Sequence, residues 1–356
     1  MKHVIGVIGA GEIAHLHMKA VAPLGWRLAG CYDVDAERAR SFCAVWGGRT
    51  YAGAQPLLED PAIDTVYLCT RHDSHVALCQ AAMAAGKNIF VEKPVALTAG
   101  EARRLLAAHQ AAPVPLAVGY NMRVAPATRR FCELLRTHGA QVSAFRASMT
   151  GPPFMSGWAS DPVQGGGVLV CQGSHMFDLL RYTLGSPIVS VCAATQHLGL
   201  DAAREPNAAV LLVKLENGAC GTLLLHDRGT ASFHAGQEGR MVGITAYAPQ
   251  GTFEMDAYGK VRWGTAEGFF EELPSRDRSQ CVSWGYAAQA AEFARLLDTG
   301  ASQLCTLEQG VQTAEAVEAA RAAAAQTQWV PVPRACDEKM EEKAGRYRRN
   351  MVFARC

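Results

Sequence analysis

The chain lacks several features that mark membrane proteins and nucleic-acid-binding proteins. No apolar run in its 356 residues approaches the roughly 18 residues that a transmembrane helix needs. An excess of one charge sign is also absent, because 34 Lys and Arg stand against 33 Asp and Glu for a net charge of +1. This balance gives no general attraction to nucleic acid or to anionic lipid. The first residues form no signal-peptide pattern, so we expect a cytoplasmic protein with neither membrane nor nucleic acid as a partner.

Paired cysteines are missing too. The chain has 12 cysteines, but none forms a CxxC motif or a Cys/His pair at zinc spacing, so we expect no metal site. Several, such as Cys69 and Cys192, lie inside apolar runs, which is typical of buried free thiols in a reducing cytoplasm. With 49% hydrophobic residues the chain has apolar material for a core without disulfides, and its length predicts about two domains.

The first 120 residues alternate between short apolar segments and longer amphipathic ones. The apolar segments predict strands and the others predict helices, the last of which follows Thr98 with Glu101 completing a capping box. The expected strands are 3–9, 27–33, 64–70, 88–93 and 115–120, and the expected helices include 12–21, 35–46 and 75–85. This alternation predicts a parallel sheet with helices on both faces.

After residue 120 the pattern becomes typical of a largely antiparallel sheet with helices on one side. Asn217-Gly218 between two alternating segments indicates a hairpin. Other strands are expected at 141–149, 188–195, 240–247 and 252–256, and helices at 126–137, at the end of 164–185, at 284–298 and at 307–326. We therefore expect a second α/β domain over 121–333 and a charged tail at 334–356. Because an open sheet leaves one face that needs cover, we also expect a homodimer or homotetramer.

A dinucleotide-binding fingerprint opens the chain. Residues 9–14 have the sequence GAGEIA, a GxGxxA pattern that follows an apolar strand and begins a helix. Gly9 allows the tight turn, and Gly11 lets the backbone approach a pyrophosphate. Asp33 ends the next strand, where its carboxylate can accept hydrogen bonds from ribose hydroxyls and would repel a 2′-phosphate. The pattern favours NAD over NADP in a domain spanning 1–120; the alternative is a plain helix start with a solvated aspartate.

A lysine stands at the end of the strand predicted at 88–93. Lys93 follows the apolar residues of that strand and precedes Pro94, which restricts it to extended backbone. Ligands of open α/β sheets bind at this carboxyl edge. An ammonium group there can donate to a substrate oxygen and stabilise alkoxide character as hydride leaves carbon.

Together these motifs resemble those of the Gfo/Idh/MocA family, which is named for glucose–fructose oxidoreductase, inositol dehydrogenase and a rhizopine-catabolism protein. The resemblance covers about residues 3–330. It rests on motifs in the family's order, namely GAGEIA (9–14), YDVD (32–35), CTRHDSH (69–75), AGKNIFVEKP (85–94), VGYNMR (118–123), GGGVLVCQGSH (165–175) and TLEQG (306–310). It implies an N-terminal Rossmann domain, a C-terminal α+β domain with an open sheet, and hydride transfer between NAD(P) and a hydroxyl of a sugar, amino sugar, glycoside or cyclitol.

The fingerprint and the resemblance together imply roles for individual residues. Lys93 would contact the substrate hydroxyl, and His175 would take or give its proton. The residues expected to line the cofactor are Gly9, Gly11, Glu12, Ile13, Asp33, Thr70, Arg71, His75, Glu92, Lys93 and Asn121. The residues expected at the substrate are Lys93, Arg123, Trp158, Cys171 and His175. For Trp158, stacking on a sugar ring and ordinary core packing both remain open.

Two positions depart from the family pattern. Cys171 stands where an aspartate usually precedes the histidine by four residues, and Arg71 stands where proline is common. If the segment around Cys171 is helical, Cys171, His175 and Asp178 share one face. His175 must then rely on Lys93, on Asp178 or on another carboxylate. Cys171 is either a neutral filler of the pocket or a thiol engaged in chemistry, and Arg71 is either solvated or reaches a phosphate or an acidic substrate.

Three functions fit these observations. The first is an NAD-dependent dehydrogenase of a sugar-like secondary alcohol. The second is an NAD-dependent glycosidase or epimerase-type enzyme, in which the cofactor is retained and not consumed. The third is a non-catalytic NAD-binding regulator, because the fungal galactose-regulon repressor shares this fold. The presence of Lys93 and His175 argues against the third, since a sensor needs neither a proton donor nor a base.

Overall fold

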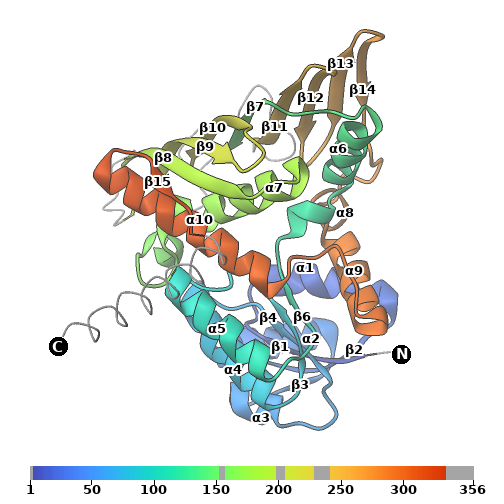
Figure 1. Cartoon of the computed structure of the whole chain (residues 1–356). Coiled ribbons are helices and arrows are strands. Elements are labelled where there is room, and N and C mark those ends of the chain that lie inside the picture. The colour runs from blue at the N-terminus through green and yellow to red at the C-terminus, as the bar shows by residue number, and fades with distance from the viewer. Residues whose placement is uncertain (1–2, 152–156, 198–204, 228–240, 334–356) are drawn as a thin grey trace, which may run out of the picture.

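Figure 1 shows the computed structural model of the chain, which describes residues 3–151, 157–197, 205–227 and 241–333. Two β-sheets lie one above the other, and the long helix α10 (Leu307–Gln326) runs between them. The charged tail expected at 334–356 lies outside the described residues. Within them, no helix combines the length and the apolar character that crossing a bilayer requires.

The N-terminal sheet is parallel throughout, as the strand–helix alternation predicts. Its strands are β1 (Val4–Ile8), β2 (Arg27–Tyr32), β3 (Arg49–Thr50), β4 (Thr65–Leu68), β5 (Asn88–Val91) and β6 (Leu116–Val118). They lie in the order β3-β2-β1-β4-β5-β6, so the order changes direction between β1 and β4. Ligands of such sheets bind in the crevice at the carboxyl ends of the strands beside this switch point.

Helices cover both faces of the N-terminal sheet. One face carries α1 (Glu12–Val21) and α2 (Ala36–Trp46), and the other carries α3 (Ala54–Leu58), α4 (His75–Ala84) and α5 (Ala99–Ala111). Local capping explains where two of them begin. Asp35 accepts hydrogen bonds from the first-turn N–H groups of α2, and Thr98 accepts one from the Glu101 N–H of α5, as predicted.

Helices from the later part of the chain complete this half of the molecule. Helix α9 (Tyr286–Thr299) packs beside α1 (Figure 1), where the buried Phe293 meets Tyr67 and Phe90 edge-on at ring-centroid distances of 5.8 and 5.3 Å. The first half of α10 inserts Leu307 into the core on the opposite face of the sheet. The sequence analysis assigns both helices to the second domain alone. In the structure their apolar faces also pack against the N-terminal sheet.

The C-terminal sheet is mixed and mostly antiparallel, as predicted. In spatial order its strands are β14 (Gly268–Glu272), β13 (Val261–Thr265), β12 (Gly251–Asp256), β11 (Met241–Ala248), β7 (Ala144–Thr150), β10 (Cys220–His226), β9 (Ala208–Leu215), β8 (Ile188–Gln196) and β15 (Val330–Pro331). Only the β7–β10 pair is parallel among these described strands. Strands β9 and β10 form the predicted hairpin, with Gly218 at a φ of 90° in its turn.

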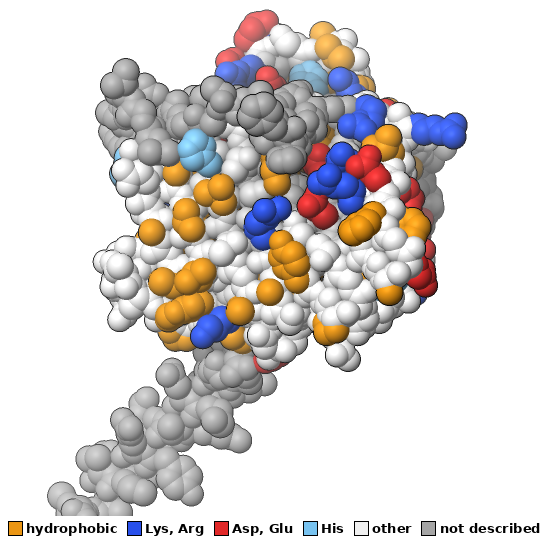
Figure 2. Space-filling model, turned by 90° about the horizontal axis from the view of Figure 1, so that it is seen from above, with side chains coloured by type: hydrophobic (Ala, Val, Ile, Leu, Met, Phe, Trp, Pro, Cys, Tyr) orange, Lys and Arg blue, Asp and Glu red, His pale blue; other side chains and the backbone are white. Residues whose placement is uncertain are grey.

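One face of the C-terminal sheet is covered and the other is open. Helices α6 (Pro126–Thr137), α7 (Ser174–Leu184) and part of α10 share an apolar core with the covered face, and the short helix α8 (Gln280–Ser283) precedes α9. On the open face, exposed and buried residues alternate along β9, which leaves Val210 and Leu212 accessible. Figure 2 looks onto this face and shows hydrophobic side chains beside a cluster of charged ones.

Candidate active site

The turn between β1 and α1 has the backbone that a bound dinucleotide requires. Gly9 has a φ of 94°, and a Cβ there would lie 2.5 Å from the Cys69 carbonyl oxygen. A Cβ on Gly11 would meet nothing within 4 Å, so open space lies in front of the turn. No side chain caps the first turn of α1, which leaves its N–H groups for a phosphate. Glu12 and Ile13 begin this helix. The turn therefore fits a dinucleotide pyrophosphate.

Asp33 lies at the carboxyl end of β2 with a fixed carboxylate. One oxygen accepts a hydrogen bond from the Ala10 N–H at 2.7 Å, and the other accepts one from the Asp35 N–H at 2.8 Å. Each carboxylate oxygen has a further lone pair, so the group can still accept from ribose hydroxyls. Through the hydrogen bond from Ala10, the carboxylate also connects the dinucleotide turn to β2. The sequence pattern does not predict this structural role.

Asp33→Ala is expected to weaken NAD binding by about tenfold or more, since a hydrogen bond to a charged group contributes roughly 1.5–3 kcal/mol. It should also relax the rejection of NADP, because the repelling charge is gone. Quenching of protein fluorescence by each cofactor measures both effects. Asp33→Asn is the control: it keeps an acceptor for the Ala10 N–H and removes the charge. A wild-type enzyme that uses NAD and NADP with equal efficiency would contradict the assignment.

The loop after β4 is tied to the loop after β5 by His75. Its ring nitrogens face two carbonyl oxygens, Nδ1 that of Pro94 at 2.8 Å and Nε2 that of Thr70 at 3.1 Å. The Lys93–Pro94 peptide is cis. Burial lowers the pKa of His75, and the neutral ring carries one N–H, which can donate to one of these two carbonyls. The ring of His75 therefore lies between the Thr70 and Pro94 carbonyls at the carboxyl edge of the sheet.

Glu92 is buried directly before Lys93. Its carboxylate lies 2.7 Å from His17 Nε2 and accepts a hydrogen bond from the Lys93 main-chain N–H at 3.1 Å. Burial raises the pKa of Glu92, but the hydrogen bond from His17 and the Lys93 charge outweigh burial and hold the pKa below its usual value. The Glu92 carboxylate is thus ionised, and its hydrogen bonds go to His17 and to the Lys93 main chain rather than to the Lys93 ammonium.

The Lys93 ammonium reaches across to the second domain. Its Nζ donates to the Cys171 carbonyl oxygen at 3.4 Å and lies 3.8 Å from the Cys171 Sγ. Cys171 belongs to a π-helical turn, Leu169–Gly173, that runs into α7. Where the sequence predicts one regular helix, the structure therefore has a π-helical turn followed by the α-helix α7. In the described residues a main-chain carbonyl and a sulfur, and no carboxylate, face this ammonium.

His175 lies in the first turn of α7 and is 7% exposed. The Tyr120 ring meets it edge-on at 5.8 Å, and its Nδ1 has no hydrogen-bond partner among the described residues. Burial lowers the pKa of His175 well below its usual value, and the nearby charge of Lys93 lowers it further. The imidazole is therefore neutral at pH 7 and can accept a proton.

Asp178 is the ion-pair partner of Arg123 and not of His175. The Arg123 guanidinium donates to both oxygens of the buried Asp178 carboxylate, at 2.6 and 2.5 Å, and to Gln309 Oε1 of α10 at 2.6 Å. Burial lowers the pKa of Arg123, but the Asp178 charge raises it above its usual value. Arg123 is 3% exposed. Its predicted contact with substrate does not fit this placement, because the guanidinium already holds α7 and α10 together.

The loop after β4 also meets the glycine-rich segment of the second domain. Arg71 Nη1 donates to Gln164 Oε1 at 2.6 Å, and His72 Nδ1 lies 3.1 Å from the Gly165 carbonyl oxygen. The half-buried Trp158 packs edge-on against the His72 ring at 4.9 Å. Sequence reasoning missed His72, although it stands between Arg71 and His75 in the same motif.

Asn121 follows β6 and is buried. Its Nδ2 donates to the Trp284 carbonyl oxygen at 2.8 Å, at the junction of α8 and α9. The described residues include no group of three or more His, Cys, Asp or Glu side chains placed to hold a metal ion. The side chains that the structure places where the two domains meet are Lys93, His175, Cys171, His72 and Arg71.

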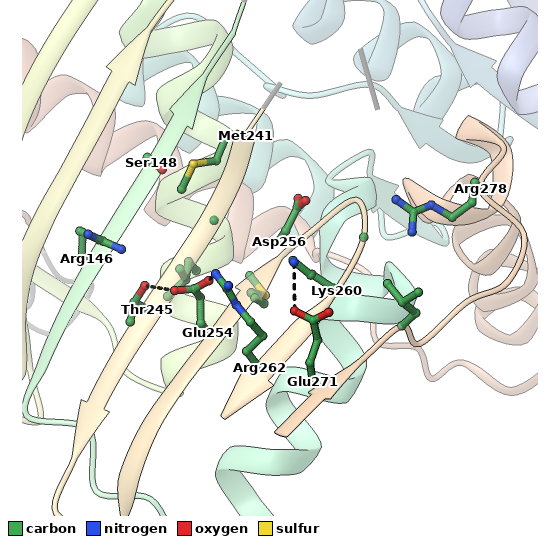
Figure 3. A pocket seen from close by; sticks show the side chains of 15 residues that line it. Arg146, Ser148, Met241, Thr245, Glu254, Asp256, Lys260, Arg262, Glu271 and Arg278 are labelled. Carbon is green, nitrogen blue, oxygen red and sulfur yellow. Dashed lines mark hydrogen bonds and ion pairs between the residues drawn. The ribbon is translucent and has the colours of Figure 1, made fainter. Parts of the chain in front are cut away.

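A separate cavity of about 340 Å³ lies on the open face of the C-terminal sheet (Figure 3). Two ion pairs lie among its lining residues, one between Arg262 and Glu254 and one between Lys260 and Glu271. None of the predicted site residues lines it. The cavity is therefore distinct from the candidate active site.

Comparisons with known proteins agree with this architecture. A family model described as an oxidoreductase family with an NAD-binding Rossmann fold matches residues 4–120, and its C-terminal α/β domain matches residues 140–332. The chain is 28% identical to 1,5-anhydro-D-fructose reductase of Ensifer adhaerens over 262 residues, which cover 69% of this chain and 78% of that protein. It is 27% identical to myo-inositol 2-dehydrogenase of Thermotoga maritima over 232 residues, 62% of this chain and 67% of that one.

A solved structure repeats the fold over nearly the whole chain. GenD2 from gentamicin A biosynthesis, in complex with NAD, superposes with a TM-score of 0.81 at 23% identity, covering 94% of this chain and 97% of that one. At this identity the likeness concerns the fold. The family matches span both domains, and the turn at Gly9 fits the cofactor they name. The chain therefore belongs to the Gfo/Idh/MocA family, and it is an NAD-dependent dehydrogenase that acts on CH–OH groups.

Proposed function

We propose that this enzyme interconverts a secondary hydroxyl and a ketone on a sugar, amino sugar, glycoside or cyclitol, with Lys93 and His175 as its catalytic residues. The observation that carries the proposal is the position of the Lys93 ammonium against the second domain. Its Nζ lies 3.4 Å from the carbonyl oxygen of Cys171, four residues before His175, and its charge lowers the pKa of the His175 ring. Relatives named as acting on anhydrofructose and myo-inositol support this substrate class.

Lys93 is placed to hold the reacting oxygen. An ammonium group has three donors, and in the described structure two of them are directed at the carbonyl oxygen and the sulfur of Cys171. The remaining donor can bind the substrate hydroxyl and stabilise the negative charge that grows on its oxygen. Bound NAD would accept the hydride in oxidation, and bound NADH would donate it in reduction.

His175 is placed to move the proton. Its lowered pKa keeps it neutral over most of the physiological range, so it can take the hydroxyl proton in oxidation. In reduction the same ring must first gain a proton. Because the ring is a weak base, its protonated form gives up this proton readily. Tyr120 packs against the ring edge-on and restricts its orientation.

A panel of sugars, amino sugars, glycosides and cyclitols with NAD tests the proposal. Oxidation is followed by nicotinamide absorbance, and NMR of the product locates the new carbonyl. Net reduction of NAD by one class of polyol is the expected result. Glycoside cleavage or epimerisation without net reduction of NAD would instead assign the enzyme to the class that retains its cofactor.

Cys171→Asp should move the acidic limb of the oxidation pH–rate profile upward by about one to three pH units, because an adjacent carboxylate raises the pKa of an imidazole. The native limb begins at low pH, since burial and the Lys93 charge lower the pKa of His175. Cys171→Ser adds no charge and should change neither limb nor rate much. The kcat/KM profile of the three proteins measures both. An unmoved limb in Cys171→Asp would remove His175 from the proton transfer.

We also propose that the open face of the C-terminal sheet joins copies of this chain in a homodimer or homotetramer. Val210, Leu212 and Leu224 are 54%, 45% and 40% exposed there. Sedimentation should give a multiple of 38.1 kDa, and Leu212→Glu should shift it toward the monomer. Val163→Glu, at a 70% exposed valine outside the sheet, is the control. A monomeric wild type would contradict the proposal.

A further inference from the structure

The Lys93 ammonium of the candidate site forms no ion pair with a carboxylate of the described residues. Lys93 Nζ faces a carbonyl oxygen and a sulfur of Cys171 in the described part of the chain. Two buried carboxylates of the surrounding elements are engaged elsewhere. Glu92 is held by His17, and Asp178 is held by Arg123. The Glu92 carboxylate still interacts electrostatically with Lys93, but no described carboxylate forms an ion pair with the ammonium.

The neighbouring histidines respond to this charge. Burial and the Lys93 ammonium together lower the pKa values of His72 and His175, so both rings are neutral. The positive potential at the reacting centre is therefore not balanced by the imidazoles. A bound anion could pair with the Lys93 ammonium without displacing a described carboxylate from it.

Arg71 adds a second cation at the rim of the same site. It follows β4 at the carboxyl edge of the sheet, and its exposed guanidinium reaches the neutral Gln164 amide of the opposite domain. The next residue, His72, contacts Gly165 in that domain and lies close enough to Lys93 to sense its charge. A guanidinium has five N–H donors, and this hydrogen bond uses one of them.

We propose that the substrate is a sugar or cyclitol that carries a carboxylate or a phosphate, and that Arg71 binds this anionic group. The proposal rests on the proposed function, whose substrate class it narrows. A planar guanidinium fits carboxylate and phosphate oxygens in a bidentate manner. Gln164 fixes the guanidinium at the rim without cancelling its charge, because its amide is neutral. The cofactor pyrophosphate belongs to a different loop, the turn at Gly9 and Gly11.

The first test compares hexuronates, hexose phosphates and the neutral parent hexoses as substrates with saturating NAD. We expect one anionic series to exceed its neutral parent in kcat/KM by about tenfold to a hundredfold, as one charge-assisted bidentate contact predicts. This advantage should shrink with rising salt concentration. The two anionic series decide between carboxylate and phosphate. Equal efficiency of anionic and neutral substrates would overturn the proposal.

The second test uses Arg71→Gln, with Arg104→Gln on α5 as a control that removes one exposed cation elsewhere. Arg71→Gln should abolish the anionic advantage in kcat/KM, whereas Arg104→Gln should preserve it. A weaker NAD Kd with an unchanged advantage would make Arg71 a cofactor residue and overturn the proposal.

Calorimetric titration of the same hexuronates and hexose phosphates into the NAD-loaded enzyme separates the two proposals. If no sugar is turned over, the proposed function fails. Saturable anion binding that Arg71→Gln removes would then still support the anionic site, and absence of binding by every anion would overturn it.

Discussion

Lys93→Ala is expected to lower kcat by on the order of 10²-fold or more, with little change in the Kd for NAD. The reason is that the ammonium stabilises charge that grows on the substrate oxygen only in the transition state. No described carboxylate forms an ion pair with the ammonium, so its N–H donors can reach the substrate oxygen. Steady-state kinetics with the substrate found in the panel, and a separate NAD titration, measure the two quantities.

Lys93→Met is the matched variant, because it keeps a long apolar stem and removes the charge. It should lose about as much kcat as Lys93→Ala, which would assign the loss to charge and not to packing. Near-normal turnover in Lys93→Met would take the ammonium out of the mechanism. A loss confined to KM would make Lys93 a residue that binds ground state and transition state equally.

His175→Ala is expected to cost about 10²- to 10⁴-fold in kcat, the usual range for a general base. The acidic limb of the oxidation profile should vanish with it, since the group that titrates is gone. A merely structural role would lower the rate without removing the limb. The pH–rate profile of kcat/KM measures this, and a melting curve shows whether the variant remains folded.

Comparison with Cys171→Ser decides between two assignments. If Cys171→Ser is as damaging as His175→Ala, the thiol takes part in the chemistry and His175 is not the sole proton-transfer group. If both variants are harmless, another residue of the second domain moves the proton.

The dinucleotide half of the fold could be predicted from the sequence because its signals are local. Alternation of apolar and amphipathic segments predicts β1, β2, β4, β5 and β6, and the predicted helix at 12–21 has the bounds of α1. Gly9 is predicted by the tight turn that it makes, and Thr98 by the cap that it supplies. Each of these features depends on residues within a few positions of one another.

Other features depend on contacts between distant segments, and the sequence pattern does not predict them. The Arg123–Asp178 pair joins residues 55 positions apart, and the contact of His72 with Gly165 spans 93. The π-helical turn at Leu169–Gly173 differs from a normal helix by spacing alone, so periodicity cannot distinguish the two. Strands β13 and β14 were not predicted, because most of their residues are partly or fully exposed and show little apolar alternation.

The packing of α9 and of the start of α10 limits where this chain can be truncated and which segments can be exchanged with a relative. The N-terminal sheet ends at Val118, yet its two cores are finished by Phe293 and Leu307. A fragment that stops after β6 would expose the apolar surfaces that these side chains bury, and it would face water where the intact protein has a core. The dinucleotide-binding half is therefore not a detachable module. A chimaera that exchanges this half between relatives has to carry the segment 286–314 with it, as a second piece of chain from far along the sequence.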